Sequence, residues 1–251
     1  MKVIAIFSEK GGVGKTTIAT NLSLYLAKKE YKVLIIDMDP QGHVHKVLGS
    51  EKKSGRVLEL LTKDKNPYDF ISKTRIENLS IIPSDWSLAD FTITVAKDPQ
   101  RHIKLRNTIQ KIKNDFDIII IDSPPSLELI TINILLASEG VIIPVLLSYL
   151  GLVGAASTLK IISQTKKVFK YSPAIIAFVP NMYEETPQSK ELLEKLKSKL
   201  GKLVSKTVIR KDPQIDRAQS YSASVFDLEQ DSVAKRDFEN LADEIILKIG
   251  I

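Results

Sequence analysis

The most constraining feature of this chain is a glycine-rich stretch that lies directly between an apolar run and a helical pattern. The apolar run covers residues 3–7, and residues 9–17 read EKGGVGKTT. Glycines let consecutive backbone N–H groups turn inward around an anion, and the helix that follows adds the partial positive charge of its N-terminus. The order of strand, glycine-rich turn and helix therefore predicts a loop that wraps the phosphate groups of a nucleotide.

One position in this loop departs from the common phosphate-loop pattern. The pattern G-x-x-x-x-G-K-[ST] has glycine where this chain has Glu9, and a second lysine, Lys10, follows it. Within the loop, Lys15 would reach the β- and γ-phosphates, and the Thr16 hydroxyl would bind Mg²⁺. The residues predicted to hold the nucleotide are Gly11, Gly12, Val13, Gly14, Lys15, Thr16 and Thr17.

The composition fits a globular α/β protein and excludes several kinds of site. Apolar residues make up 43% of the chain and charged residues 26%, which suits a sizeable core. The chain has no cysteine, so disulfides, zinc–thiolate sites and cysteine-bound iron–sulfur clusters are excluded. The opening apolar run is too short for a signal peptide, and no uninterrupted run reaches the roughly 18 apolar residues of a membrane span. We therefore expect a cytoplasmic protein.

Short β-branched runs alternate with amphipathic segments along the whole chain. Several runs are apolar throughout, as strands buried on both faces of a parallel sheet should be. The alternation predicts a doubly wound α/β fold with a mostly parallel sheet, one domain over residues 1–251, and ligands at the carboxyl ends of the strands. Strands are expected at residues 3–7, 33–37, 79–83, 117–122, 141–145, 174–179 and 207–209, and helices at residues 16–29, 105–114, 154–167, 189–200 and 235–248. Residues 51–67 are expected to form a polar loop with room for one short helix.

Two further strands bring carboxylates to the edge that carries the phosphate loop. Asp37 and Asp39 follow the second strand, and Asp122 closes a run of four isoleucines at the end of the fourth. Asp122 would hold Mg²⁺ through water, Asp37 would support the metal shell, and Asp39 is the better candidate for orienting the attacking water. The alternative is that strand-end aspartates only cap the helices that follow. Three of them beside a phosphate loop favour the functional interpretation.

These motifs resemble the ParA/MinD family of deviant Walker ATPases, and more closely its ParA/Soj branch. The resemblance rests on KGGVGKTT (residues 10–17), DMDPQG (37–42) and IDSPPS (121–126), with weaker matches at IIPSDWSLAD (81–90) and VIRKDPQIDRAQSYSASVFD (208–227). It covers nearly the whole chain. It implies a P-loop NTPase of the deviant Walker A type, an Mg²⁺-dependent ATPase in which two monomers close face to face around two ATP molecules.

The resemblance also implies roles for single residues. Lys10 would reach across to the partner's phosphates and stabilise transition-state charge in trans, as an arginine finger does. Together with Lys15 and Asp39 it makes up the predicted catalytic set. By position in the family's pattern, Asn181 and the neighbourhood of Pro213 form the adenine pocket, although Asn181 would equally suit a turn.

Two segments depart from the family's pattern. The second motif continues with His43, Val44 and His45 where the family often has Asn-Ala-Thr. The two histidines lack a third ligand nearby, so we interpret them as surface or core residues rather than as a metal site. Near the end of the chain, Ser222 stands where the family carries glycine, so the turn there can differ.

A basic segment indicates a candidate contact with nucleic acid. Residues 187–217 hold nine Lys/Arg against four acids, and leucines at 192, 196 and 200 mark the buried stripe of a helix. Such a surface would bind double-stranded DNA through its phosphates without reading the sequence. The alternative is a solvated lysine face. With the family resemblance we favour DNA binding, and the expected contacts are Lys199, Lys202, Arg210, Lys211 and Arg217.

The resemblance implies a function in chromosome or plasmid partition, in which the ATP homodimer coats DNA on the nucleoid and a ParB-like centromere-binding partner stimulates hydrolysis. A MinD-like membrane-associated ATPase is one alternative, and it would need a C-terminal amphipathic helix with a basic face. The tail of this chain instead carries acids on its polar face, namely Asp237, Glu239, Asp243 and Glu244. We therefore expect the tail to pack against the sheet and expect no membrane contact. The second alternative is a ParA-like ATPase that positions a protein cargo.

Overall fold

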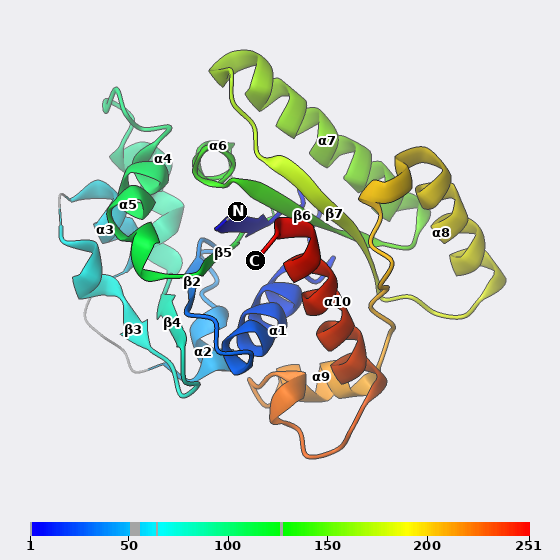
Figure 1. Cartoon of the computed structure of the whole chain (residues 1–251). Helices are drawn as coiled ribbons and strands as arrows, with labels where there is room; N and C mark the ends of the chain where they lie inside the picture. Colours follow the sequence, from blue (N-terminus) through cyan, green and yellow to red (C-terminus); the bar gives the residue numbers. More distant parts are fainter. Residues whose placement is uncertain (1, 51–55, 64, 126–127) are drawn as a thin grey trace.

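The computed structural model describes residues 2–50, 56–63, 65–125 and 128–251 (Figure 1). Within these residues seven strands form one sheet in the order β3-β4-β2-β5-β1-β6-β7. Neighbouring strands are parallel except β3 and β4. The strands are β1 (Val3–Ile6), β2 (Val33–Asp37), β3 (Ser72–Lys73), β4 (Leu79–Ile82), β5 (Ile118–Asp122), β6 (Gly140–Leu146) and β7 (Ala174–Asn181). This confirms the predicted doubly wound, mostly parallel sheet.

Helices cover both faces of the sheet (Figure 1). One face carries α1 (Lys15–Lys28), α2 (Val44–Leu48), α9 (Pro213–Ser220), the 3-10 helix η5 (Val225–Asp227) and α10 (Val233–Ile249). The other carries α3 (Val57–Thr62), α4 (Phe91–Thr94), α5 (Lys104–Ile112), α6 (Glu128–Ala137), α7 (Tyr149–Phe169) and α8 (Pro187–Leu200). The remaining 3-10 helices are η1 (Pro67–Phe70), η2 (Trp86–Asp90), η3 (Lys113–Asp115) and η4 (Gly201–Leu203).

The central strands are buried on both faces, as their unbroken apolar sequences predict. In β5, Ile119 and Ile121 face the core under α5–α8, while Ile118 and Ile120 face the core under α1 and α10. Successive side chains of a strand point to opposite faces, so a strand covered on both sides needs apolar residues at every position. Asp122 follows directly and is the first polar residue of that run.

One predicted strand is wrong. Residues 207–209 run beside the edge strand β7, where Ile209 N donates to Pro180 O and Tyr183 N donates to Ile209 O. Among the described residues, the chain on either side of this segment forms isolated bridges, Phe178 with Val204 and Tyr183 with Arg210. The segment therefore touches β7 at separate points and does not continue a ladder of hydrogen bonds along it.

The sequence prediction also missed or shortened some elements. The helix α6 is apolar almost throughout, so it shows no helical periodicity, and β3 is too short and polar to give a strand pattern. The helix α7 begins at Tyr149 rather than at residue 154, because Ser148 caps it and its side chain accepts from Gly151 N. The short helix expected within residues 51–67 is α3, and residues 51–55 and 64 lie outside the described residues.

The C-terminal helix α10 packs against α1 and β7, as predicted for the tail. Phe238, Leu241, Ala242 and Ile245 are buried in the core that these elements share. Four apolar side chains at helical spacing thus fix α10 to the body of the molecule, beside α1 in Figure 1.

Among the described residues, no helix is both long enough and apolar enough to cross a membrane.

Candidate nucleotide site

The phosphate loop connects β1 to α1 at the carboxyl edge of the sheet. Gly12 and Gly14 have φ angles of 71° and 87°, in the region that favours glycine. At Gly14 the packing is equally restrictive, because an added Cβ would lie 2.2 Å from Nδ2 of Asn181. Asn181 ends β7, is buried, and donates from Nδ2 to Val13 O at 2.7 Å. The predicted residue Asn181 therefore lies against the loop.

Lys15 is the first residue of α1, and only 7% of its surface is exposed. Its Nζ donates to Lys10 O at 3.0 Å, so the side chain spans the loop. Burial lowers the pKa of Lys15, although the carboxylates of Asp122 and Asp39 oppose that change. A partly desolvated cation held within a glycine-rich loop is suited to bind phosphate oxygens.

Asp122 and Thr16 form the centre of the predicted metal site. Thr16 Oγ1 donates to Asp122 Oδ2 at 2.7 Å. The other carboxyl oxygen, Oδ1, is buried and has no hydrogen-bond partner among the described residues. Asp37 is the register neighbour of Asp122 on β2. The Thr16 hydroxyl, Oδ1 of Asp122 and the Asp37 carboxyl are oxygen ligands of the kind that Mg²⁺ prefers, bound directly or through water.

Burial makes ionisation of both carboxyls costly. Burial raises the pKa of Asp122 to about 7, and the hydrogen bond from Thr16 acts in the opposite direction. Burial and the nearby Asp122 carboxyl raise the pKa of Asp37 well above its usual range. Two adjacent acids in a low-dielectric site favour a bound cation. No group of three His, Cys, Asp or Glu among the residues described could hold a metal ion alone. Mg²⁺ would therefore take further ligands from phosphate and water.

Asp37 also has a structural role. Its Oδ1 accepts from Asp39 N at 3.0 Å, and its Oδ2 accepts from Val44 N, the first residue of α2, at 3.3 Å. The capping role considered from the sequence therefore holds for Asp37. Asp39 is partly exposed, and its carboxylate accepts only from Gln41 N, at 2.9 Å, within the described part of the chain. It remains the better placed of the two to act on a water molecule.

Helix α9 reaches the phosphate loop through a residue that the sequence did not reveal. Gln219 Nε2 donates to Thr17 Oγ1 at 2.8 Å. Gln219, Thr16 and Thr17 line a cavity of about 310 Å³ between α1, α2 and α9. Pro213, the predicted neighbour of adenine, is the exposed first residue of α9 and lines a different pocket, beside Tyr183. Gln219 lies within the weaker family match at residues 208–227, but its contact with Thr17 was not evident from the sequence because it depends on how α9 packs on α1.

The start of the loop rests on α7. Thr158 Oγ1 accepts from Glu9 N at 3.3 Å, and Ser157 Oγ donates to the Glu9 carboxylate. Lys10 follows, and its Nζ makes no hydrogen bond or ion pair with any residue that the structure describes. The sequence singled out Glu9 and Lys10 but gave no sign of their partners on α7.

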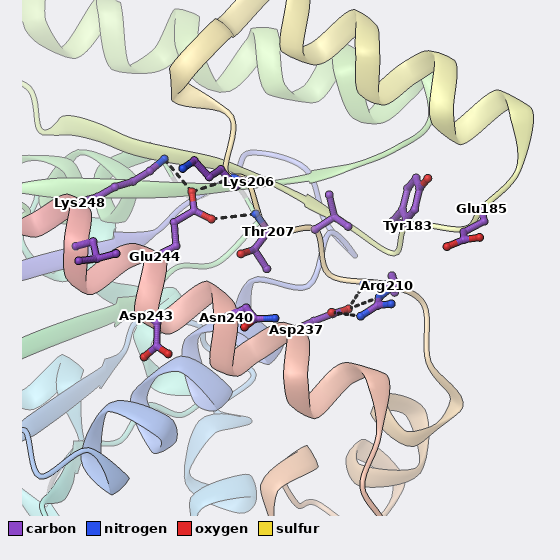
Figure 2. Close-up of a pocket in the computed structure, with 12 residues that line it drawn as sticks. Tyr183, Glu185, Lys206, Thr207, Arg210, Asp237, Asn240, Asp243, Glu244 and Lys248 are labelled. Atoms are coloured by element: carbon purple, nitrogen blue, oxygen red, sulfur yellow. Dashed lines mark hydrogen bonds and ion pairs between the residues drawn. The ribbon is translucent and has the colours of Figure 1, made fainter.

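The predicted DNA contacts divide into two groups. Arg210 forms a two-point ion pair with Asp237, from Nε to Oδ2 at 3.0 Å and from NH2 to Oδ1 at 2.5 Å (Figure 2). The Asp237 side chain is only 5% exposed, so it is part of the packing rather than of an acidic outer face. Lys211 Nζ pairs with Glu184 at 2.7 Å. Of the five predicted contacts, Lys199, Lys202 and Arg217 are exposed and have no ion pair to any described residue.

The fold and the site together define a class of protein. A glycine-rich loop with Lys15 inside it, Thr16 bonded to a strand-end aspartate, and a mostly parallel sheet are the parts of a P-loop NTPase. The second lysine at the start of the loop places it in the deviant Walker A type. Ser126, the last residue of the third motif, lies outside the described residues.

The family model of an AAA domain matches residues 1–175. The chain is 34% identical to the sporulation initiation inhibitor protein Soj of Bacillus subtilis, over 97% of this chain and 98% of that protein. It is 30% identical to the chromosome-partitioning ATPase Soj of Treponema pallidum, over 99% of this chain and 98% of that protein. This chain belongs to the ParA/Soj family of P-loop ATPases.

Solved structures agree with this assignment. The ATP complex of a McdA variant from Cyanothece superposes with a TM-score of 0.88 at 26% identity, and the match covers 100% of this chain and 97% of that one. The septum site-determining protein MinD of Pyrococcus horikoshii, complexed with Mg-ADP, superposes with a TM-score of 0.79 at 27% identity. The match covers 99% of this chain and 97% of that one. The protein is thus a ParA-type ATPase of positioning or partition, with ATP and Mg²⁺ as its cofactors.

Proposed function

We propose that this protein is a partition ATPase that works as an ATP-closed homodimer. The observation that carries the proposal is Lys10, whose ammonium has no partner within the described part of the chain. At the same edge, the first two turns of α7 expose Tyr149, Leu150 and Val153 by 73%, 65% and 50%. Exposed apolar side chains beside an unpaired cation suit a surface that a second copy covers.

The proposed roles of the site residues draw on their contacts and on the family resemblance. Lys15 and the backbone N–H groups of residues 11–17 hold the phosphates, and Thr16 and Asp122 hold Mg²⁺, with Asp37 supporting them. Asp39 orients the attacking water, and Lys10 stabilises charge on the partner's phosphates. When bound, Mg²⁺ would supply positive charge beside the phosphate groups.

The proposed dimer binds double-stranded DNA without reading its sequence, on the nucleoid in the cytoplasm, and a ParB-like centromere-binding protein stimulates its ATPase. Lys199, Lys202 and Arg217 support this part, because they are exposed and free of ion pairs among the described residues. Arg210 and Lys211 are engaged with Asp237 and Glu184, and we place them second. The name of the Treponema pallidum relative supports chromosome partition. We assign the function to one ATPase domain over residues 1–251.

The test uses the Asp39→Ala variant, which should bind ATP and stay in the closed state because hydrolysis lacks its water-orienting group. Its binding to a random-sequence DNA duplex is measured by fluorescence anisotropy with ATP or ADP over a salt series. We expect binding that requires ATP, weakens steeply with salt and ignores sequence. Lys15→Ala, which lacks the cation for the phosphates, is the negative control. Absence of binding in both nucleotide states would refute the DNA role and direct the search to liposomes and protein cargo.

The role of Lys10 is tested separately by sizing chromatography with light scattering. In the Asp39→Ala background, Lys10→Ala should keep ATP binding by the monomer but lose the ATP-dependent dimer. A dimer of unchanged stability would contradict the cross-subunit role and leave the ATPase assignment intact.

A further inference from the structure

One face of α7 supports the two residues that open the phosphate loop, Glu9, which departs from the common pattern, and Lys10. Gly154, Ser157 and Thr158 follow the i, i+3, i+4 spacing that places residues on one side of a helix. Thr158 is fully buried, and its hydroxyl donates to Gly154 O at 2.9 Å while accepting from Glu9 N. Ser157 binds the Glu9 carboxylate. Glu9 is therefore attached to α7 through both its backbone and its side chain.

The Lys10 side chain lies against the same face of α7, next to Gly154. A Cβ added at Gly154 would lie 3.1 Å from Lys10 Cβ and 3.3 Å from Lys10 Cδ. These separations are shorter than carbon–carbon contacts normally are. The aliphatic part of Lys10 thus occupies the space that any side chain at position 154 would need. Glycine is among the least favourable residues for a helix interior, so its presence here suits a position where the Lys10 side chain passes.

We propose that Gly154, Ser157 and Thr158 are positioning residues that hold Lys10 against α7 before a second copy arrives. A lysine side chain loses much rotamer freedom when it is fixed, and a side chain already held in place loses less on association. Exposed Tyr149, Leu150 and Val153 begin the same helix, so the surface that a partner would cover and the support for Lys10 are one rigid element. The consequence for dimer formation rests on the proposed function.

The first measurement is the reactivity of Lys10 in the nucleotide-free monomer, read by mass spectrometry after brief acylation with an N-hydroxysuccinimide ester. Gly154→Leu should expel the Lys10 side chain from α7 and raise its acylation rate several-fold. Gly154→Ala should have a smaller effect in the same direction. Ala156→Leu adds similar bulk at an exposed position of α7 and should leave the rate unchanged. Alanine and leucine both favour helix over glycine, so these variants should fold.

The hydroxyl contact is tested by Ser157→Ala, which should raise Lys10 reactivity, and by Ser157→Thr, which keeps the hydroxyl and should restore the parent rate. This readout needs no dimer, so it decides the positioning proposal even if the parent protein never dimerises. Unchanged Lys10 reactivity in Gly154→Leu would overturn the proposal.

The second measurement is the ATP-dependent dimer dissociation constant, taken in the Asp39→Ala background by analytical ultracentrifugation. Gly154→Leu should weaken the dimer at least tenfold and leave the ATP affinity of the monomer within about twofold, while Ala156→Leu should match the parent. An equally tight Gly154→Leu dimer would overturn the proposal. A parent that stays monomeric with ATP would instead refute the proposed function, and the acylation result would stand on its own.

Discussion

At the scale of single residues, the site combines groups that would each be unfavourable alone. Asp122 and Asp37 are fully buried, neighbouring carboxyls, and Lys15 is a largely buried amine. Burial raises the pKa of both carboxyls and lowers the pKa of the amine, so it favours the neutral form of each group. A nucleotide with its metal ion supplies the opposite charges, phosphate for Lys15 and Mg²⁺ for the acids. The cost of burying these groups is thus offset when the ligand binds, which favours the bound state.

Ser222 is one of the non-glycine residues with a left-handed backbone conformation. Its φ angle is 51°, in the left-handed region that costs an L-residue about 1–2 kcal/mol. The resembling family carries glycine at this position, and the sequence left open whether the turn differs. A serine held at this φ retains a conformation that glycine would adopt freely.

Ser222→Gly should therefore raise the free energy of unfolding by about 0.5–1 kcal/mol, because relief of the left-handed strain outweighs the extra freedom of glycine in the unfolded chain. Urea denaturation followed by circular dichroism would measure it. Ser222→Ala keeps the Cβ and should give no such gain. Equal stabilisation by both variants would mean that the serine hydroxyl, and not the backbone, is the source of the strain.

At the scale of elements, α10 is tied to the segment after α8 by one carboxylate. Glu244 accepts from Lys206 N and Thr207 N, each at 2.9 Å, and pairs with Lys248 at 3.3 Å (Figure 2). Burial alone would raise the pKa of Glu244, but the hydrogen bonds from Thr207 and Lys206 outweigh it and lower the pKa. The ionised form therefore stabilises the contact between α10 and this segment.

Glu244→Gln should lower the free energy of unfolding by about 1–2 kcal/mol at pH 7, because an amide nitrogen then faces one of the two backbone N–H donors and cannot accept its hydrogen bond. A lowered folded-state pKa contributes stability above the unfolded value near 4.5 and loses it as the pH falls through the folded value. The difference between parent and variant should thus shrink as the pH falls below 4.5. Urea titrations from pH 7 to pH 3.5 test this. Glu239→Gln, on the same helix, is the control, and a pH-independent difference would contradict the charge-based explanation.

How much of the fold the sequence predicts depends on whether a pattern is local. The strands β1, β2 and β5 were predicted because an apolar run needs no knowledge of its neighbours. The helix α6 was missed because burial on most sides removes the periodicity that marks a helix. Residues 207–209 were predicted as a strand from their β-branched side chains, but whether a segment forms a ladder depends on a partner far away in the chain.

The same limit holds for the site. The loop residues Lys15 and Thr16 follow from a contiguous motif, and their contact with strand-end Asp122 follows from the parallel sheet. Gly154, on α7, lies 144 positions from Lys10 in the numbering, and no pattern connects them. Such contacts become visible only when the elements are packed.

At the scale of the whole molecule, lysines that look alike in the sequence differ in whether an acidic side chain pairs with them. Along α8, Lys195 and Lys197 pair with Glu191 and Glu194 at 2.6 Å and 3.3 Å. Lys199 and Lys202, just beyond, have no such pair among the described residues. This region lies at the end of the sheet beyond β7, away from α3–α5 (Figure 1). A phosphate backbone that approaches there would meet two unpaired cations after two that are already neutralised.

A matched pair of double variants can separate local contact from net charge. Lys199→Gln with Lys202→Gln should weaken ATP-dependent DNA binding and reduce the slope of log K against log salt by about 0.9 for each phosphate that the protein no longer neutralises. Lys195→Gln with Lys197→Gln removes the same charge from paired lysines. Because those lysines give up an ion pair to bind phosphate, their replacement should change the slope much less. Fluorescence anisotropy of the Asp39→Ala protein over a salt series measures both. Equal changes in slope would show that DNA responds to the overall positive field of α8, and Lys199 and Lys202 would then have no special contact.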